Sequence, residues 1–274
     1  MEEQKISVFP KQDLSVDDKP EELFYEEDDL ISPLSVQTNA TLNNSVYNLN
    51  GTKMFVPNAN IADLLLVTAR TGSNEKDISL FIIPSTAEGI TISPLSTISS
   101  DKQFVINLDN VQIPSSNLIG NENSAWKTIE TIFDMAAVGK SCEMLGAGEK
   151  VLEGTVEYAK TRTQFGRPIG SFQAIKHKCA DMLLEVESAK SAAYYAGWCA
   201  AEMNDELPST ASLAKAYCSE AYFHSAAENI QIHGGIGFTW EHPAHLYFKR
   251  AKSSELMFGA PAYHRELLAQ RLGL

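Results

Sequence analysis

Apolar and polar positions follow two different patterns along the chain. Residues 32–121 are rich in β-branched side chains, and their short apolar runs end at turn signals. These runs predict β-strands over 64–71, 78–84 and 103–113, and a hairpin around Asn50-Gly51. The first half is therefore predicted to be a small antiparallel β-sandwich or barrel.

From residue 124 onward, apolar residues recur every three or four positions. This period predicts helices over 124–161, 171–203, 207–233 and 241–270, the last one interrupted near Gly259 and Pro261. Helices beyond ~25 residues usually lie against partners of similar length. The second half is thus predicted to be a long four-helix up-down bundle that offers apolar surface to another subunit.

Together the two patterns predict an α+β protein. The β domain is expected at residues 32–122 and the helical-bundle domain at residues 123–274, after an acidic leader at residues 1–31. The chain has 35 acidic and 22 basic side chains, and eleven of the acids lie within residues 1–29. Such a segment is usually solvated, so the leader is expected to be partly mobile; the alternative is a docking tail.

The formal net charge of −13 and the lack of a basic cluster exclude a nucleic-acid partner. No apolar run approaches the ~18 residues of a membrane span, and an acidic N-terminus is not that of a signal peptide. The four cysteines are far apart in the sequence, so we expect reduced thiols within helices. The expectation is a soluble, cytoplasmic protein.

Several common catalytic motifs are excluded. The segment Gly146–Gly148 lies within a helical pattern, and Val151 stands where a dinucleotide fingerprint needs its third glycine. His242 and His245 share a helical face without a carboxylate at ligand spacing, so no metal site is predicted. A di-iron bundle would need Glu-x-x-His pairs, which the sequence lacks.

Two longer strings carry stronger signals. YAKTRTQFGRPIGSFQAIKHKCADM at 158–182 and QIHGGIGFTWEHPAHLYFKRAK at 231–252 each place a glycine-containing turn between two helices. Glycines let backbone N–H groups approach a ligand, the next helix N-terminus favours an anion, and Arg162 offers a guanidinium for a phosphate. The structural alternative is that the glycines only cap a helix and Arg162 pairs with a carboxylate.

In this order, the RxQFG and QxxGGxG strings resemble those of the acyl-CoA dehydrogenase family. LNGTKMFVPNA at 49–59 is similar to the family's middle-domain strand, and FDMAA at 133–137 to its substrate-facing helix segment. The resemblance runs from about Ser45 to the C-terminus. It implies an enzyme that oxidises acyl-CoA thioesters with FAD, and an architecture of a helical N-terminal, a β middle and a four-helix C-terminal domain.

The resemblance also implies three groups of binding residues. The residues that contact the pyrophosphate and adenosine portions of FAD would be Arg162, Gln164, Phe165 and Gln173. Those that meet the FAD of a neighbouring subunit would be Gln231, Gly234 and Gly235. The pantetheine path of the CoA ester would be lined by Phe133 and Asp134.

Assembly is a further implication of the resemblance. It implies a homodimer or homotetramer, with a partner subunit as an alternative, and an electron-transfer flavoprotein as a candidate partner. The family's helical N-terminal domain has no counterpart in the sequence. The acyl pocket is therefore expected to be open, unless another polypeptide supplies its wall or the sequence is a fragment.

The sequence departs from the family where the catalytic base should stand. Removing an α-proton needs a carboxylate against that carbon, but Phe258 and Ala136 occupy the family's two base positions. Glu255 lies one helical turn, ~5 Å, before the first position and is the remaining candidate. Glu143 is ~10 Å past the second position and is a poorer one. The catalytic residue is therefore unknown from the sequence.

The flavin-facing part of the resemblance is also altered, because Pro57 stands where the family has a hydroxyl donor to the flavin. Two functions remain open. One is an FAD-dependent acyl-CoA dehydrogenase whose base is displaced or comes from a partner chain. The other is a catalytically silent family member that acts as a structural or FAD/CoA-binding subunit of a hetero-oligomer.

Overall fold

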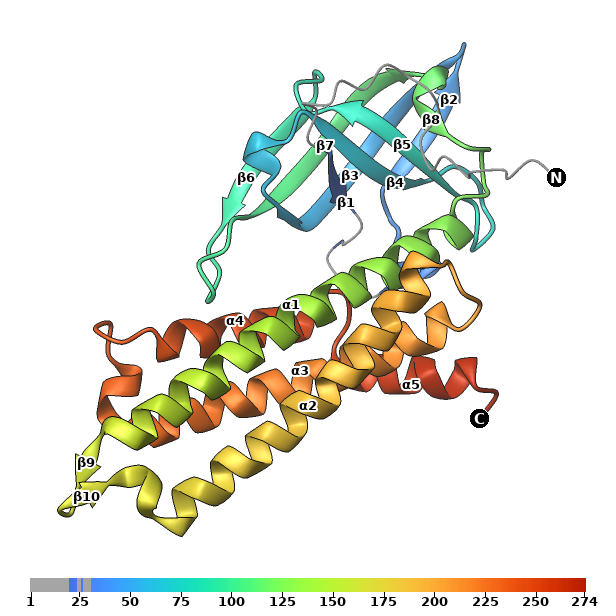
Figure 1. Cartoon of the computed structure of the whole chain (residues 1–274). Helices are drawn as coiled ribbons and strands as arrows, with labels where there is room; N and C mark the ends of the chain where they lie inside the picture. Colours follow the sequence, from blue (N-terminus) through green and yellow to red (C-terminus); the bar gives the residue numbers. More distant parts are fainter. Residues whose placement is uncertain (1–19, 24–25, 27–30) are drawn as a thin grey trace. The chain divides into compact units, whose positions relative to one another are not determined.

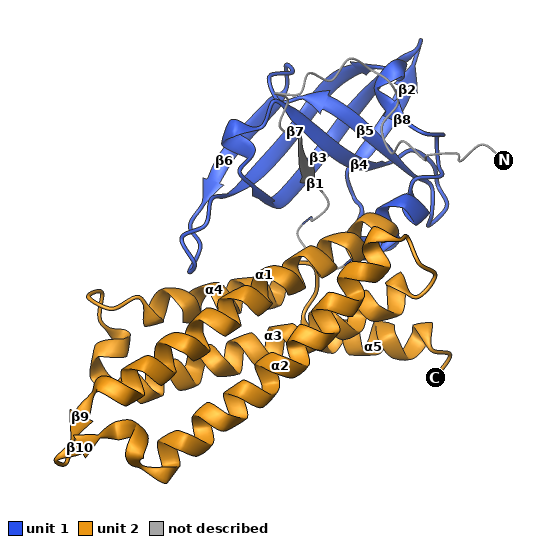
Figure 2. Cartoon of the chain, viewed as in Figure 1, with its two compact units in different colours: residues 1–130 blue, residues 131–274 orange. Residues whose placement is uncertain are grey.

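The computed structural model describes residues 20–23, 26 and 31–274. The chain divides into two compact units, residues 1–130 and residues 131–274 (Figure 2). The predicted mobility of the acidic leader concerns residues that lie mostly outside the described ones. Two described parts of that segment are strand β1 (Pro20–Leu23) and the side chain of Glu26.

The first unit is a β domain with a mixed sheet in the order β6-β7-β3-β2-β4-β5-β8, with β1 beside β4 (Figure 1). Its remaining strands are β2 (Asn39–Asn43), β3 (Val46–Pro57), β4 (Leu64–Arg70), β5 (Ile78–Pro84), β6 (Ile90–Leu95), β7 (Gln103–Pro114) and β8 (Leu118–Ile119). Strand pairs are antiparallel except β1–β4 and β2–β4. The predicted small β domain is confirmed, and these two parallel pairings are an addition to it.

The hairpin predicted at Asn50-Gly51 is wrong. Strand β3 continues through these residues, and the chain reverses at Asn44-Ser45, whose φ angles are 49° and 69°. Two consecutive left-handed residues give the tight turn that matches the twist of paired strands. Gly51 lies at a register shift between β3 and β7, and a Cβ there would lie 2.4 Å from Thr38 Oγ1. The glycine therefore serves a bulge and a close approach rather than a turn.

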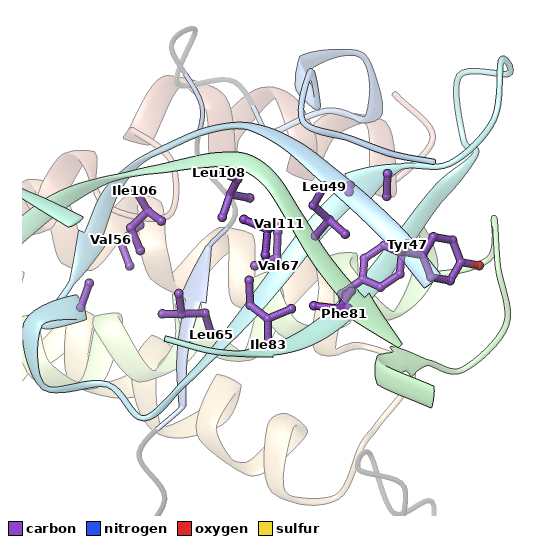
Figure 3. Packing of buried hydrophobic residues seen from close by; sticks show 14 of the residues in the cluster. Tyr47, Leu49, Val56, Leu65, Val67, Phe81, Ile83, Ile106, Leu108 and Val111 are labelled. Carbon is purple, nitrogen blue, oxygen red and sulfur yellow. The ribbon is translucent and has the colours of Figure 1, made fainter. Parts of the chain in front are cut away.

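The core of the β domain forms between the buried faces of β3, β4, β5 and β7 (Figure 3). The rings of Tyr47 and Phe81 meet edge to face with centroids 4.8 Å apart. The other side chains labelled in this core are Leu49, Val56, Leu65, Val67, Ile83, Ile106, Leu108 and Val111. Nearly every residue of β4 and β5 is buried, which is why both strands are continuous apolar runs in the sequence.

A charged pair also lies inside the β domain. Lys53 Nζ is 2.7 Å from Glu26 Oε1 and 2.9 Å from Thr68 Oγ1, and its side chain is fully buried. The Glu26 carboxylate also accepts the backbone N–H groups of Gln37 and Thr38. Burial lowers the pKa of Lys53, although the Glu26 carboxylate opposes that shift. Glu26 is thus a buried structural residue, unlike the solvated acid that the composition of the leader predicts.

The second unit is helical, and its helices follow the sequence prediction closely (Figure 1). They are α1 (Trp126–Thr161), α2 (Gln173–Ala201), α3 (Leu207–His233), α4 (Ala244–Leu256) and α5 (Pro261–Arg271). The interruption expected near Gly259 and Pro261 separates α4 from α5. Pro261 begins α5, where its missing N–H leaves no hydrogen bond unmade. The α+β fold with a C-terminal helical bundle is confirmed.

The helices pack through small residues, since Ala189 and Ala193 of α2 face Cys218 and Tyr222 of α3 within one buried cluster. All four cysteines are free thiols on helices, and Cys142 is exposed. None of the described helices combines the length and apolarity that a membrane crossing needs. Among the described residues, no cluster of His, Cys, Asp and Glu could hold a metal ion.

Candidate functional site

The two glycine-containing strings lie at the same end of the helical unit. Helix α1 ends at Thr161 and is followed by the hairpin of β9 (Thr163–Gln164) and β10 (Arg167–Pro168), seen at one end of the bundle in Figure 1. Helix α3 ends at His233 and is followed by the short helix η5 (Gly234–Phe238). The Tyr158 ring stacks on the His233 ring with centroids 4.0 Å apart, so α1 and α3 end beside each other.

The side chains predicted to bind the nucleotide are exposed at this end. Within the described part of the chain, none of the side chains of Arg162, Gln164, Gln173 and Gln231 has a hydrogen-bond or ion-pair partner. The structural alternative for Arg162, pairing with a carboxylate, is therefore not what the structure shows. Gly234 and Gly235 are also exposed, and a Cβ at either position would meet no atom. These four side chains can therefore meet a ligand without first breaking internal hydrogen bonds.

The N-terminus of α2 adds to the positive character of this end. Gln173 begins a helix of 29 residues, with no side-chain cap at Phe172 and no acidic residue in the first turn. The free N–H groups of such a terminus carry partial positive charge and favour an anion. Together with the free guanidinium of Arg162, they suit a pyrophosphate. The residues present thus fit the nucleotide part of FAD, on the strength of these unused donors.

Aromatic side chains near this end were not identified from the sequence, apart from Phe165. Phe165 is 90% exposed at the tip of the hairpin, while Phe238 and Trp240 are 72% and 81% exposed after α3. Phe165 has a φ of 52° and its ring lies 6.1 Å from that of Phe172, centroid to centroid. The exposure of Phe238 and Trp240 could not be predicted from motifs, because exposure depends on the fold.

The residues predicted near the acyl group form a second cluster. The ring of Phe258, between α4 and α5, contacts the ring of Phe133 on α1 edge to face, with centroids 6.2 Å apart. Ala136 lies three residues after Phe133 and so on the same face of α1. The structure therefore places Phe258 against the face of α1 that carries Ala136, the second position that the family resemblance links to proton abstraction. Neither a phenyl ring nor a methyl group accepts a proton.

Asp134 is buried and engaged with another residue of this unit. Its carboxylate oxygens lie 2.9 and 3.1 Å from Arg271 Nη2. The Arg271 guanidinium also donates to the carbonyl oxygen of Pro208 and to Ser212 Oγ, and so joins α1, α3 and the end of α5. The carboxylate has a structural partner here, and its contact with a pantetheine amide stays a prediction.

The two acids considered as replacement bases are also paired. Glu255 Oε1 lies 3.0 Å from Lys252 Nζ. Glu143 accepts hydrogen bonds from Lys140 and Arg250. Burial alone would raise the pKa of Glu143, but these two cations outweigh it and lower the pKa. A carboxylate with a lowered pKa is a weaker base, so Glu143 suits proton abstraction poorly.

Two buried basic side chains beside Phe258 were missed by the sequence analysis. Lys215 Nζ donates to the carbonyl oxygens of Glu255 at 3.0 Å and Gly259 at 2.9 Å, and burial lowers its pKa to about 7. His264 Nε2 lies 2.7 Å from the Phe258 carbonyl oxygen, and burial lowers its pKa to about 4. Neither residue belongs to a local motif; their meeting with this turn follows from the packing of α3 and α5.

Comparison with known proteins assigns the family. Residues 123–273 match the acyl-CoA dehydrogenase C-terminal domain model, and residues 26–111 match the acyl-CoA dehydrogenase middle domain model. The chain belongs to the acyl-CoA dehydrogenase family. The resemblance inferred from the two strings is thereby confirmed.

Individual relatives in the acyl-CoA dehydrogenase family agree with this assignment. The chain is 33% identical over 242 residues to the probable acyl-CoA dehydrogenase YngJ of Bacillus subtilis (strain 168), covering 86% of this chain. It spans 63% of the length of that relative, and so less than two thirds of it.

Two solved structures show the same fold. Butyryl-CoA dehydrogenase from Megasphaera elsdenii superposes with a TM-score of 0.88 at 27% identity, covering 93% of this chain and 68% of that one. The ChsE4-ChsE5 complex from Mycobacterium tuberculosis superposes with a TM-score of 0.83 at 26% identity, covering 94% and 67%.

Proposed function

We propose that this chain takes part in the FAD-dependent α,β-dehydrogenation of an acyl-CoA thioester. The observation that supports this most directly is the gathering of unpartnered Arg and Gln side chains at one end of a family-typical helical domain. In this reaction a proton leaves the α-carbon, a hydride leaves the β-carbon, and a C=C bond forms. Bound FAD would supply the hydride acceptor.

Each part of the nucleotide end has a role in this proposal. Arg162 and the free N-terminus of α2 would neutralise the pyrophosphate, and the exposed ring of Phe165 would pack on the adenine. The side-chain amides of Gln164, Gln173 and Gln231 offer both donors and acceptors to the nucleotide. Gly234 and Gly235 would let the backbone approach the cofactor closely.

The proton acceptor is the part that the chain lacks at its expected place. Phe258 and Ala136 carry no basic group, so the α-proton has to go to a carboxylate outside the Phe258 turn. Glu255, one turn earlier, is tied to Lys252. We therefore propose that a carboxylate from another polypeptide acts as the base. We further propose that the protein is cytoplasmic, assembles with copies of itself, and has an acyl-CoA and an electron-transfer flavoprotein as partners.

A second function is favoured by one observation, the contact of the Phe258 ring with Phe133. A chain whose base position is occupied by the Phe258 ring, packed on Phe133, suits a catalytically silent subunit of a hetero-oligomer. One solved relative is itself described as a complex of two components, ChsE4 and ChsE5. In that case this chain would bind FAD or CoA, or only support its partner.

Spectroscopy of the purified full chain separates the two functions. The first predicts a protein that retains FAD, shows the visible absorbance band of oxidised flavin, and loses that band when butyryl- or octanoyl-CoA is added without oxygen. The second predicts a band that no acyl-CoA changes, or no band at all. A colourless protein that does not take up added FAD would contradict a flavoenzyme formed by this chain alone.

Restoring the missing carboxylate tests the position of the base. We expect Phe258→Glu to speed the loss of the flavin band with octanoyl-CoA, because it places a proton acceptor opposite α1. Leu256→Glu is the matched control. Leu256 lies two residues earlier and its side chain is exposed, so this substitution adds the same charge at the surface rather than at residue 258. Equal behaviour of the two variants would show that residue 258 is not the base position.

A further inference from the structure

Three aromatic rings meet at one end of the helical unit. The Tyr158 ring of α1 stacks on the His233 ring of α3, with an interplanar angle of 24°. The His242 ring, from the loop before α4, also lies on His233, with centroids 4.3 Å apart and an interplanar angle of 40°. The contact between His233 and His242 thus joins the segment 234–243 to the end of α3.

The hydrogen bonds of the two imidazoles determine which nitrogen carries the hydrogen. His233 Nδ1 lies 2.8 Å from the Asn229 carbonyl oxygen, which only accepts, so His233 carries a hydrogen on Nδ1. His242 Nδ1 accepts the backbone N–H of Ala244 at 3.2 Å, so a neutral His242 carries its hydrogen on Nε2. The arrangement therefore needs opposite tautomers in the two rings, and it needs His242 to be neutral.

A proton on His242 would oppose this arrangement in three ways. It would occupy Nδ1, the atom that accepts the Ala244 N–H. It would place a positive charge before the first turn of α4, where the free N–H groups already carry partial positive charge. It would also bring a cation against His233, whose exposed fraction is 7%. Each effect favours detachment of the His242 ring.

His233 responds to acid in the same direction. Burial lowers its pKa; the hydrogen bond to the Asn229 carbonyl oxygen opposes this shift, and His242 adds to it. In the described part of the chain, the ion pairs of histidine with carboxylates are formed by His224 and not by these two rings. The other ionisable groups on the elements that meet the two rings are Tyr158 and Arg162 of α1, Glu241 of the loop, and His245 and Lys249 of α4.

The segment 234–243 reaches α3 through few contacts. Gly237 packs on the end of α3, and a Cβ there would lie 3.2 Å from His233 Cβ. The large side chains of Phe238 and Trp240 are exposed. Loss of the contact between His233 and His242 therefore loosens the segment from α3.

We propose that the contact between His233 and His242 is a pH-sensitive switch: the neutral rings hold the segment 234–243 against α3, and acid releases it. The segment begins with Gly234 and Gly235, which the family resemblance assigns to the FAD of a neighbouring subunit. Acid is thus expected to weaken FAD binding over the range in which imidazole titrates. This consequence for FAD rests on the proposed function, whereas the switch itself does not.

Amide hydrogen exchange of the full chain tests the switch without a ligand. We would follow the peptides that cover residues 234–244 at about pH 7.5 and about pH 5.5, corrected for the intrinsic pH dependence of exchange. Because only the released segment accepts the proton freely, its opening should increase about tenfold between these two values. Peptides of α2 should show no such increase. Equal protection of residues 234–244 at both values would overturn the proposal.

Substitutions at residue 242 separate the switch from a general effect of acid. His242→Asn keeps an acceptor for the Ala244 N–H but does not titrate, so we expect the same exchange at both pH values. His242→Lys has a charge and no acceptor, so we expect fast exchange at both. His177→Gln, at an exposed position on α2, is the matched control and should behave like the wild type. A His242→Asn protein that keeps the wild-type pH dependence would contradict the switch.

A second measurement reports on the tautomers directly. Nitrogen-15 spectra of histidine-labelled wild type, assigned with His233→Gln and His242→Asn, should show opposite tautomers in the two rings at about pH 7.5. At about pH 5.5 the His242 ring should carry hydrogen on both nitrogens. The same tautomer in both rings at the higher pH would contradict the proposal.

FAD titration connects the switch with the proposed function. The wild type should bind FAD roughly tenfold more weakly at about pH 5.5 than at about pH 7.5, and His242→Asn should bind equally at both. An equal loss of affinity in both proteins would overturn the part of the proposal that concerns FAD. If neither protein binds FAD at either pH, the proposed function of the chain is wrong, and hydrogen exchange still decides whether the switch exists.

Discussion

His264 couples the stability of the helical unit to pH. Its Nε2–H donates to the Phe258 carbonyl oxygen, and its Nδ1 is buried without a partner among the described atoms. Burial lowers the pKa to about 4, and the nearby cations Lys215 and Arg271 act in the same direction, against the hydrogen bond to Phe258. The folded chain therefore keeps this imidazole neutral at a pH where the unfolded chain, with a pKa near ~6.5, protonates it.

Acid is accordingly predicted to destabilise the protein through His264. As the pH falls from about 6.5 to about 4, only the unfolded chain gains this proton, so the free energy of unfolding drops by up to about 1.4 kcal/mol per pH unit. Urea unfolding at several pH values should show this loss in the wild type and less of it in His264→Gln. His177→Gln, at an exposed position on α2, is the control. An equal loss in all three proteins would exclude His264 as the cause.

Single residues also show where sequence reasoning stops. Arg162 and the glycines of the second string could be found because their types and spacing form a local pattern. Lys215 could not, because its role depends on a contact with residues 255 and 259, some forty positions away. A lysine inside a helical period predicts an exposed position, and only tertiary packing shows the opposite.

At the scale of elements, the period of apolar residues predicted the helices well, whereas the Asn50-Gly51 dipeptide predicted a turn wrongly. The predicted helix over 207–233 has the observed bounds of α3, because Pro208 stands in its first turn and Gly234 follows its last residue. The Asn50-Gly51 hairpin failed for the opposite reason. A dipeptide preference is weak beside the pairing of β3 with β7, where Leu49 faces Val111 and Gly51 faces Leu108.

The element that follows α1 supports a prediction on cofactor affinity. Arg162 lies directly before the β9–β10 hairpin with its guanidinium unpaired among the described residues. A charge-assisted hydrogen bond to a phosphate contributes enough that Arg162→Gln should weaken FAD binding roughly 10- to 100-fold. The measurement is FAD titration by fluorescence quenching at two salt concentrations.

Lys160→Gln is the matched control for this prediction. It removes the same charge two residues earlier, where the side chain pairs with Glu157 on the helix surface. We expect it to leave FAD affinity nearly unchanged. Equal weakening by both substitutions would point to general charge attraction rather than to contact with Arg162.

At the scale of the whole molecule, the buried pair of Lys53 and Glu26 ties a distant part of the chain to the β domain. Glu26→Gln would leave Lys53 as an uncompensated charge in the core, so we predict a loss of about 3–5 kcal/mol in the free energy of unfolding. Denaturant unfolding measures this directly. Glu75→Gln, which changes an exposed loop acid, should change stability little. A Glu26→Gln protein as stable as the wild type would show that the pair contributes little to folding.

The same pair bears on how a shorter version of the protein should be prepared. The charge pattern alone suggests trimming the gene at residue 31, after the acidic leader. That cut would remove β1, which pairs with β4 over Leu64–Val67, and with it the carboxylate that neutralises Lys53. One edge of β4 would then carry unpaired backbone groups, which template association between chains. Such a product is expected to aggregate during expression, whereas a chain that keeps residues 20–26 retains both the strand and the counter-charge.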